Sequence, residues 1–98
     1  MPIRKILVVD DSPVERLALQ EVLGRNGYQV LTAENGEQAI ARSRSDHPDL
    51  ILMDVVMPGM NGYQATRTIS RDDETRDIPI IMCTSKGQET DKIWGMRH

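Results

Sequence analysis

Short apolar runs alternate with longer segments of mixed polarity along this chain. The runs are rich in Val, Ile and Leu, which predicts buried strands, and they are Lys5–Val9, Gln29–Ala33, Leu50–Met53 and Ile80–Cys83. The second run is the least apolar, as is typical of an edge strand. Such alternation indicates βα units, in which helices cover both faces of a parallel sheet.

The helix starts are marked by N-cap residues followed three positions later by Glu or Gln, the arrangement of a capping box. The pairs are Ser12 with Glu15, Asn35 with Gln38, and Asn61 with Gln64. They predict a first helix from Pro13, a second from Gly36 to about Ser45 and a third from Gly62 to about Arg71. A last helix is expected from about Gln88 to Met96.

Apolar residues of the first predicted helix recur at three- and four-residue spacing, which predicts a stripe packed against the core. These residues are Val14, Ala18, Leu19, Val22 and Leu23. In the second helix the same spacing predicts that Ala39, Ile40 and Ser43 face the core.

Composition narrows the class of protein. With 98 residues, 39% apolar and 28% charged, the chain fits one soluble domain. No apolar run approaches the roughly 20 residues of a membrane helix, and no signal peptide is apparent, so we expect a cytoplasmic protein. The net charge of −3 and scattered basic residues indicate no nucleic-acid binding. The single cysteine, Cys83, is interpreted as a buried, inert thiol.

Acidic residues follow two of the predicted strands. Because ligands bind outside the carboxyl ends of the strands in doubly wound sheets, Asp10, Asp11 and Asp54 are expected to converge there. Such an all-oxygen cluster suits Mg²⁺. Asp at a strand end is also a common helix cap or turn former, but Ser12 already fills the cap role, which leaves the carboxylates without a structural task.

Asp54 is the better candidate for a nucleophile towards phosphorus, since a carboxylate can form an acyl phosphate beside a cation. It precedes the loop 55–62, whose Pro and Gly residues suit a backbone carbonyl ligand. Thr84 ends the fourth strand and could donate its hydroxyl to a phosphoryl oxygen, although such a Thr is often a turn former.

Three segments, ILVVDDS, LILMDVVMPGMNG and IPIIMCTS, resemble the signature segments of bacterial two-component response regulator receivers. The resemblance implies a flavodoxin-like α/β fold with strand order 2-1-3-4-5 and Asp54 as phosphoacceptor. It further implies Asp11 as a direct Mg²⁺ ligand with Asp10 assisting partly through water, the Val56 carbonyl as another ligand, and Thr84 as the switch hydroxyl.

The resemblance also implies partners. A sensor histidine kinase or phosphotransfer protein would supply the phosphoryl group, and a downstream protein target would respond, so the chain is not a turnover enzyme. The stretch KGQETDKIWGM resembles small regulators of type IV pilus twitching motility. Two alternatives stay open: a phosphate-independent interaction module, and an aspartyl-phosphate hydrolase, whose DxD spacing Asp10-Asp11 does not match.

The chain departs from the family at its end. Receivers have five βα units, and the fifth carries a Lys and an aromatic residue of the switch, whereas four units are predicted here. Lys86 and Lys92 are interpreted as surface residues. We therefore expect residues 1–98 to form a receiver domain that is incomplete at its C-terminus, with an exposed fourth strand that favours dimerisation or domain swapping.

Overall fold

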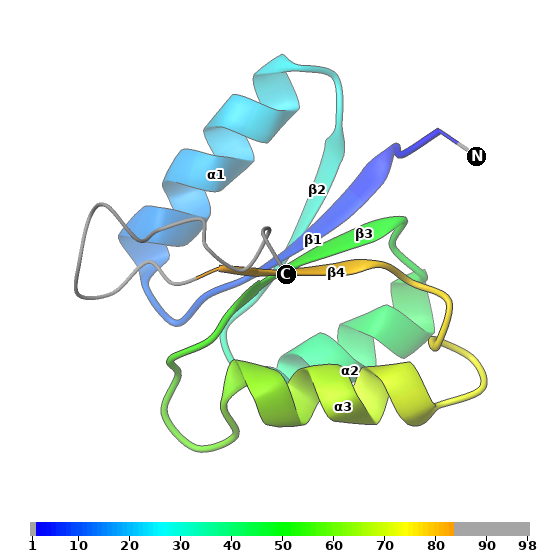
Figure 1. Cartoon of the computed structure of the whole chain (residues 1–98). Coiled ribbons are helices and arrows are strands. Elements are labelled where there is room, and N and C mark those ends of the chain that lie inside the picture. The colour runs from blue at the N-terminus through cyan, green and yellow to red at the C-terminus, as the bar shows by residue number, and fades with distance from the viewer. Residues whose placement is uncertain (1, 84–98) are drawn as a thin grey trace.

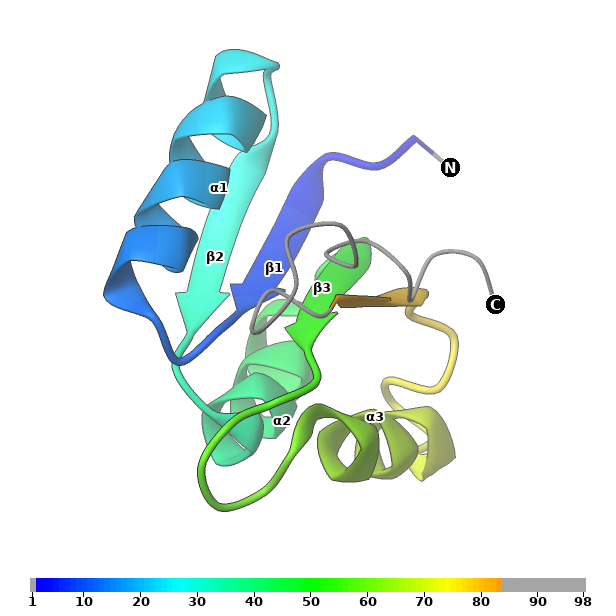
Figure 2. The same cartoon turned by 60° about the vertical axis from the view of Figure 1, so that its left-hand side comes forward.

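The computed structural model describes residues 2–83, which form one parallel sheet and three helices (Figure 1). The elements in chain order are β1 (Lys5–Val9), α1 (Pro13–Arg25), β2 (Gln29–Ala33), α2 (Gly36–Asp46), β3 (Leu50–Asp54), α3 (Gly62–Arg71) and β4 (Ile80–Cys83). The sheet order is β2-β1-β3-β4, and the arrowheads of β1, β2 and β3 point the same way (Figure 2). The predicted doubly wound α/β fold is confirmed. Thr84 and the expected helix Gln88–Met96 lie outside the described residues.

Three strands have the predicted bounds, and β3 is one residue longer. Asp54 pairs with Cys83 in the register between β3 and β4, and the next amide, that of Val55, donates to the Cys83 carbonyl at 2.9 Å. The ladder therefore continues through Asp54, which makes this carboxylate part of the strand rather than of the loop.

All three predicted N-caps are present, but only one forms a full capping box. The side chain of Asn61 accepts from the Gln64 amide at 2.9 Å, and the Gln64 side chain accepts from the Asn61 amide at 3.0 Å. At α2 the Gln38 side chain instead accepts from the Glu34 amide. The start of α3 is thus fixed from both directions.

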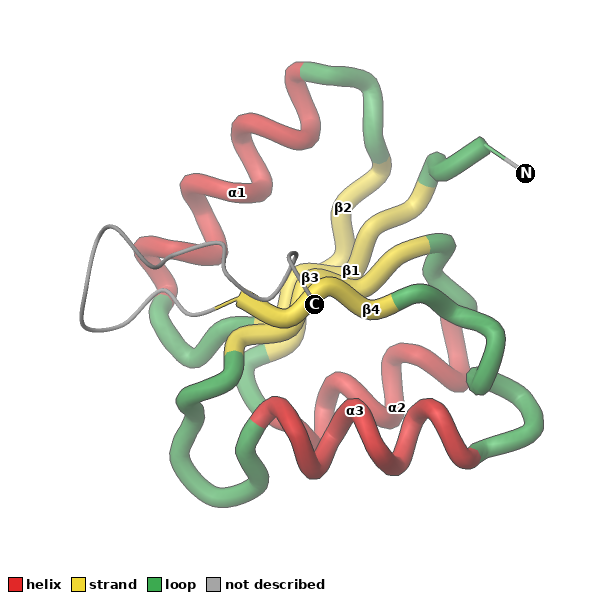
Figure 3. The backbone as a smooth tube through the Cα atoms, viewed as in Figure 1, coloured by secondary structure: helices red, strands yellow, loops and turns green. Residues whose placement is uncertain are grey.

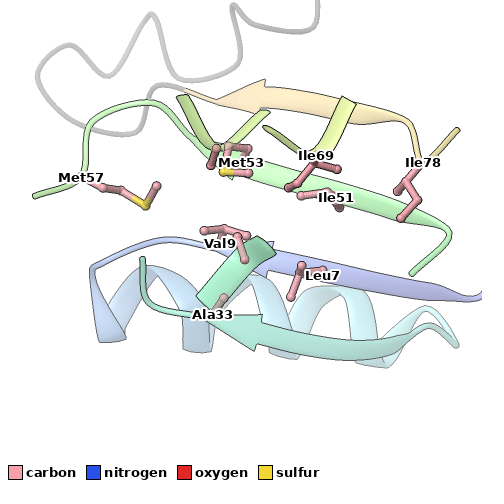
Figure 4. Packing of buried hydrophobic residues seen from close by; sticks show 10 residues of the cluster. Leu7, Val9, Ala33, Ile51, Met53, Met57, Ile69 and Ile78 are labelled. Atoms are coloured by element: carbon pink, nitrogen blue, oxygen red, sulfur yellow. The ribbon is translucent and has the colours of Figure 1, made fainter. Parts of the chain in front are cut away.

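The helices lie on opposite faces of the sheet, α1 on one and the pair α2 and α3 on the other (Figures 1 and 3). The main core fills the space between the sheet and the α2–α3 layer (Figure 4). Ala39 and Ser43 of α2 are buried there and Ile40 is partly buried, as predicted. The cluster consists of Leu7, Val9, Ala33, Ala39, Ile51, Met53, Met57, Ala65, Ile69 and Ile78.

The prediction for α1 is wrong in part. Val14 and Val22 are 75% and 52% exposed, and Ala18 is exposed as well, while Leu19 and Leu23 are half-buried. Of the five predicted residues only Leu19 and Leu23 are partly buried, so the helix is rotated away from the predicted stripe. Among residues 2–83, Val14, Leu17 and Val22 of this helix remain exposed.

No helix in the described part of the chain is long and apolar enough to cross a membrane.

Candidate functional site

Three carboxylates converge at the carboxyl ends of β1 and β3. Val9 pairs with Met53, so the residues that follow, Asp10 and Asp54, stand side by side. One oxygen each from Asp10, Asp11 and Asp54 lies within 4.8 Å of the others. Asp10 and Asp54 are almost fully buried, at 4% and 2% exposure, whereas Asp11 is partly exposed. The predicted acidic cluster is therefore present, with one member open to solvent.

Asp10 is held by its own helix start. One of its carboxylate oxygens accepts a hydrogen bond from the Ser12 amide at 2.9 Å, and its carbonyl accepts from the Arg16 guanidinium at 2.7 Å. The expectation that Asp10 has no structural task is therefore wrong, because its side chain forms a local turn of the type that Asp favours. Its hydrogen bond with Ser12 fixes the direction of the carboxylate.

The backbone after Asp54 is held on both sides. The Val55 amide donates to the carbonyl of Cys83 in β4, and the Val55 carbonyl accepts from the amide of Gly62 in α3, both at 2.9 Å. Asp54 is therefore followed by a peptide that is hydrogen-bonded both to the end of β4 and to the start of α3.

Two methionines anchor the loop between β3 and α3. Met57 is buried in the core cluster, and Met60 packs against Gly36 at the start of α2, where an added Cβ would lie 2.8 Å from the Met60 sulfur. Between them, Pro58 and Gly59, with a φ of 74° at Gly59, supply the residues that a type II turn requires. Val56 lies between the held Val55 and the buried Met57, with its side chain 53% exposed.

The donor set fits a small divalent cation. Two unit charges 4.8 Å apart, the largest separation in this cluster, repel by about 3.5 kcal/mol at an effective dielectric constant of about 20. Burial of Asp10 and Asp54 adds a desolvation cost. Mg²⁺ prefers carboxylate oxygens and retains several waters, and the partly exposed Asp11 leaves the cluster a solvent-facing side. Asp10, Asp11, Asp54 and the Val56 carbonyl are the groups that could hold it.

The carboxylates of the acidic cluster also act on the thiol of Cys83. Burial, and then the carboxylates of Asp54 and Asp10, raise the pKa of the Cys83 thiol. The residue is only half-buried, less than predicted, because it lies at the end of the outermost described strand.

The sequence pointed to Asp10, Asp11 and Asp54, and the structure brings all three together. Val56 lies in the adjoining loop, and Thr84 is outside the described residues. One contributor, Arg16, was missed. Gly62 was among the glycines noted in the loop 55–62, but its contact with the Asp54 backbone was not predicted, although a Gly directly after an N-cap has poor helix propensity and suggests a steric reason.

Comparison with known proteins agrees with this site. Residues 6–98 match the family model of the response regulator receiver domain, and the chain belongs to this family, a phosphoacceptor module of two-component signalling. It is 55% identical over 94 residues to the protein PilH of Pseudomonas aeruginosa, covering 96% of this chain and 78% of PilH. It is 45% identical to the phosphate regulon regulator PhoB of the same organism, covering 95% of this chain and 41% of PhoB.

Solved receiver structures are similar throughout the described fold. The regulator TrrA of Thermotoga maritima, solved with Mg²⁺ and BeF, is 39% identical with a TM-score of 0.79, covering 87% of this chain and 72% of that one. The receiver domain of the Pseudomonas aeruginosa sensor histidine kinase PA1611, solved with magnesium in its active-site cleft, is 34% identical with a TM-score of 0.81, covering 92% and 74%.

Proposed function

We propose that Asp54 of this chain accepts the phosphoryl group in a Mg²⁺-dependent reaction. Asp11 is a direct Mg²⁺ ligand, Asp10 assists partly through water, and the Asp54 carboxylate and the Val56 carbonyl complete the protein's share of the ligands. Thr84 supplies a hydroxyl to the phosphoryl group. The observation that supports this assignment best is the convergence of three carboxylates within 4.8 Å at the strand ends.

Asp54 is the proposed acceptor among the three because it ends the central strand β3 and stands where the resemblance assigns the phosphoryl group. Its backbone is fixed by β4 and α3, while one oxygen of Asp10 is engaged with the Ser12 amide. An Asp54 oxygen attacks phosphorus in line, the bond from phosphorus to the donor's imidazole nitrogen breaks, and that nitrogen keeps the electron pair. Bound Mg²⁺ would neutralise the phosphoryl oxygens as charge develops.

The test uses a small phosphodonor and intact mass. The chain is incubated with acetyl phosphate, with and without Mg²⁺, beside an Asp54→Asn variant. We expect a Mg²⁺-dependent gain of about 80 Da, the mass of one phosphoryl group, and no gain in the variant. An unmodified wild-type chain, folded and saturated with Mg²⁺, would favour the alternative of a phosphate-independent interaction module.

A sensor histidine kinase or phosphotransfer protein is the proposed donor, and the start of α1 is its proposed contact. Pro13 begins this helix two residues after Asp11, and Val14 and Leu17 are 75% and 62% exposed. Exposed apolar side chains beside a reactive group suit a docking partner.

The kinase contact can be separated from the chemistry. With a histidine kinase that labels the wild-type chain, Leu17→Ser is expected to slow transfer about tenfold, a typical loss for one interface anchor, and to leave acetyl phosphate labelling unchanged. Val22→Ser is the matched control, since Val22 is also aliphatic and exposed, at 52%, but lies further along α1. Equal transfer to all three proteins would contradict this docking site.

Self-association through β4 is the next part of the proposal. Within residues 2–83, β4 pairs with β3 alone, and an uncovered strand edge can pair with another copy or swap. Light scattering after size exclusion should show dimers whose share rises with concentration, and Ile81→Lys should reduce them. A monomer at all concentrations would contradict this.

The signalling pathway of this chain and its location in the cell are also part of the proposal. We propose a cytoplasmic regulator of type IV pilus twitching motility, acting on a downstream protein target. Support comes from the KGQETDKIWGM segment and from the 55% identity to PilH. Loss of twitching in a deletion strain, restored by the wild-type gene and not by Asp54→Asn, is the expected result.

A further inference from the structure

The backbone contact between Gly62 and Asp54 lies behind the acidic site. A Cβ added at Gly62 would overlap the carbonyl oxygen of Asp54 and lie 2.9 Å from the Cα of Val55. Both obstacles are backbone atoms, which cannot swing aside as a flexible side chain can. Glycine is the only residue that lets two backbones approach this closely.

The same glycine also makes the hydrogen bond that joins α3 to the site. Its amide donates to the Val55 carbonyl at 2.9 Å, and the Val55 amide is already bound to β4. The Asp54–Val55 peptide is therefore clamped between β4 and the first residue of α3. Val56, whose carbonyl is a proposed Mg²⁺ ligand, follows directly.

The start of α3 cannot easily retreat from this contact. The full capping box of Asn61 and Gln64 fixes the first turn, and Ala65 and Ile69 of the same helix are buried in the core. A side chain at position 62 would therefore strain the Asp54–Val55 peptide as well as the helix start. The displacement would fall on the carboxylate and on the loop that carries Val56.

We infer that Gly62 is a positioning residue, which sets the Asp54 carboxylate and the Val56 carbonyl at the spacing that Mg²⁺ binding and phosphoryl transfer require. This inference rests on the proposed function. Gly62 lies against the backbone of Asp54 rather than its carboxylate, and it acts through the Asp54–Val55 peptide.

The test compares Gly62→Ala with Gly24→Ala, which makes the same substitution in α1, where nothing lies within 4 Å of the new Cβ. Mg²⁺ affinity is measured by calorimetry and the acetyl phosphate rate at saturating Mg²⁺, with urea unfolding beside them. For Gly62→Ala we expect Mg²⁺ binding to weaken about tenfold, as for other residues that support metal ligands. The rate should fall by about 10- to 100-fold, since small misplacements are costly. Gly24→Ala should match the wild type in both.

A purely structural glycine predicts a different result. If Gly62→Ala lowers stability but the folded variant binds Mg²⁺ and reacts like the wild type, the inference is overturned. A wild-type chain that binds Mg²⁺ without gaining a phosphoryl group would overturn the proposed function instead, and the comparison of Mg²⁺ affinities would still decide the role of Gly62.

A wild-type measurement covers the case in which Gly62→Ala does not fold. In a Mg²⁺ titration followed by amide NMR, the Gly62 signal should shift together with those of Asp54 and Val55, and the Gly24 signal should stay in place. A Gly62 amide that does not move while Asp54 and Val55 do would overturn the inference.

Discussion

Cys83 lies directly opposite Asp54 in the pairing of β4 with β3, so its thiol responds to the charge of the acidic site. Burial, followed by the carboxylates of Asp54 and Asp10, raises the pKa of this thiol. Because the thiolate is the reactive form, a raised pKa makes the thiol a slow nucleophile near neutral pH.

Cys83 is therefore a built-in probe of the site. At pH 8 we expect iodoacetamide to alkylate Cys83 more slowly in the native chain than in urea, because the raised pKa lowers the fraction of reactive thiolate. Asp54→Asn should speed the native reaction, because one of the charges that raise the pKa is removed. Intact mass follows both rates. Equal rates in native and unfolded chains would contradict this account.

The crowding of three carboxylates has a cost in stability that Mg²⁺ should relieve. In buffer without Mg²⁺, Asp54→Asn is expected to raise the free energy of unfolding, since it removes one of three repelling charges. The wild type should gain about 2.7 kcal/mol when Mg²⁺ is present at about 100 times its Kd, and the variant should lose most of this gain. Urea unfolding measures both.

The matched control for lost charge is Asp73→Asn, whose side chain is 94% exposed and distant from the site in the chain. It should respond to Mg²⁺ as the wild type does. A Mg²⁺ gain that persists in Asp54→Asn would place the ion elsewhere.

Asp49 links the start of β3 to the start of β1, at the end of the sheet opposite the acidic site. One of its oxygens accepts from the amides of Arg4 and Lys5, each at 2.9 Å, and these hydrogen bonds lower the pKa of the carboxyl from its ordinary value of 3.8. A lowered pKa means that the folded state favours the ionised form. This stabilisation is complete above pH 3.8 and is lost as the pH falls through the lower, folded-state pKa.

The expected result is a pH-dependent difference between the wild type and Asp49→Asn. The wild type should be the more stable at pH 7, and the difference should shrink as the pH is lowered below about 4, where the unfolded carboxyl is protonated. Urea midpoints from pH 7 to pH 3 test this. A constant difference over that range would show that the charge of Asp49 does not matter.

Burial predicts a large loss of stability for truncation of Ile51 in β3 and little loss for truncation of Val14 in α1. Ile51 is fully buried in β3, whereas Val14 is 75% exposed. Ile51→Ala should lower the free energy of unfolding by about 2–5 kcal/mol, and Val14→Ala should change it by about 0.5 kcal/mol or less. A large loss in Val14→Ala, measured by urea unfolding, would mean that this face of α1 is covered in solution.

Much of the fold could be predicted from the sequence because its signals are local. The apolar runs set the strands, and Ser12, Asn35 and Asn61 set the helix starts, since an N-cap needs only the next three residues. The acidic cluster also followed from local signals once the parallel topology was assumed, because strand ends on one edge must meet.

Contacts between distant segments were decided by the tertiary structure alone. The rotation of α1, which leaves Val14 and Val22 outside, depends on how Leu19 and Leu23 meet the sheet, and several stripes of this helix are apolar enough to serve. The close approach of Gly62 to the Asp54 carbonyl depends on where α3 starts relative to β3. Periodicity reports which residues share a face, but only packing decides which face is covered and which backbone atoms touch.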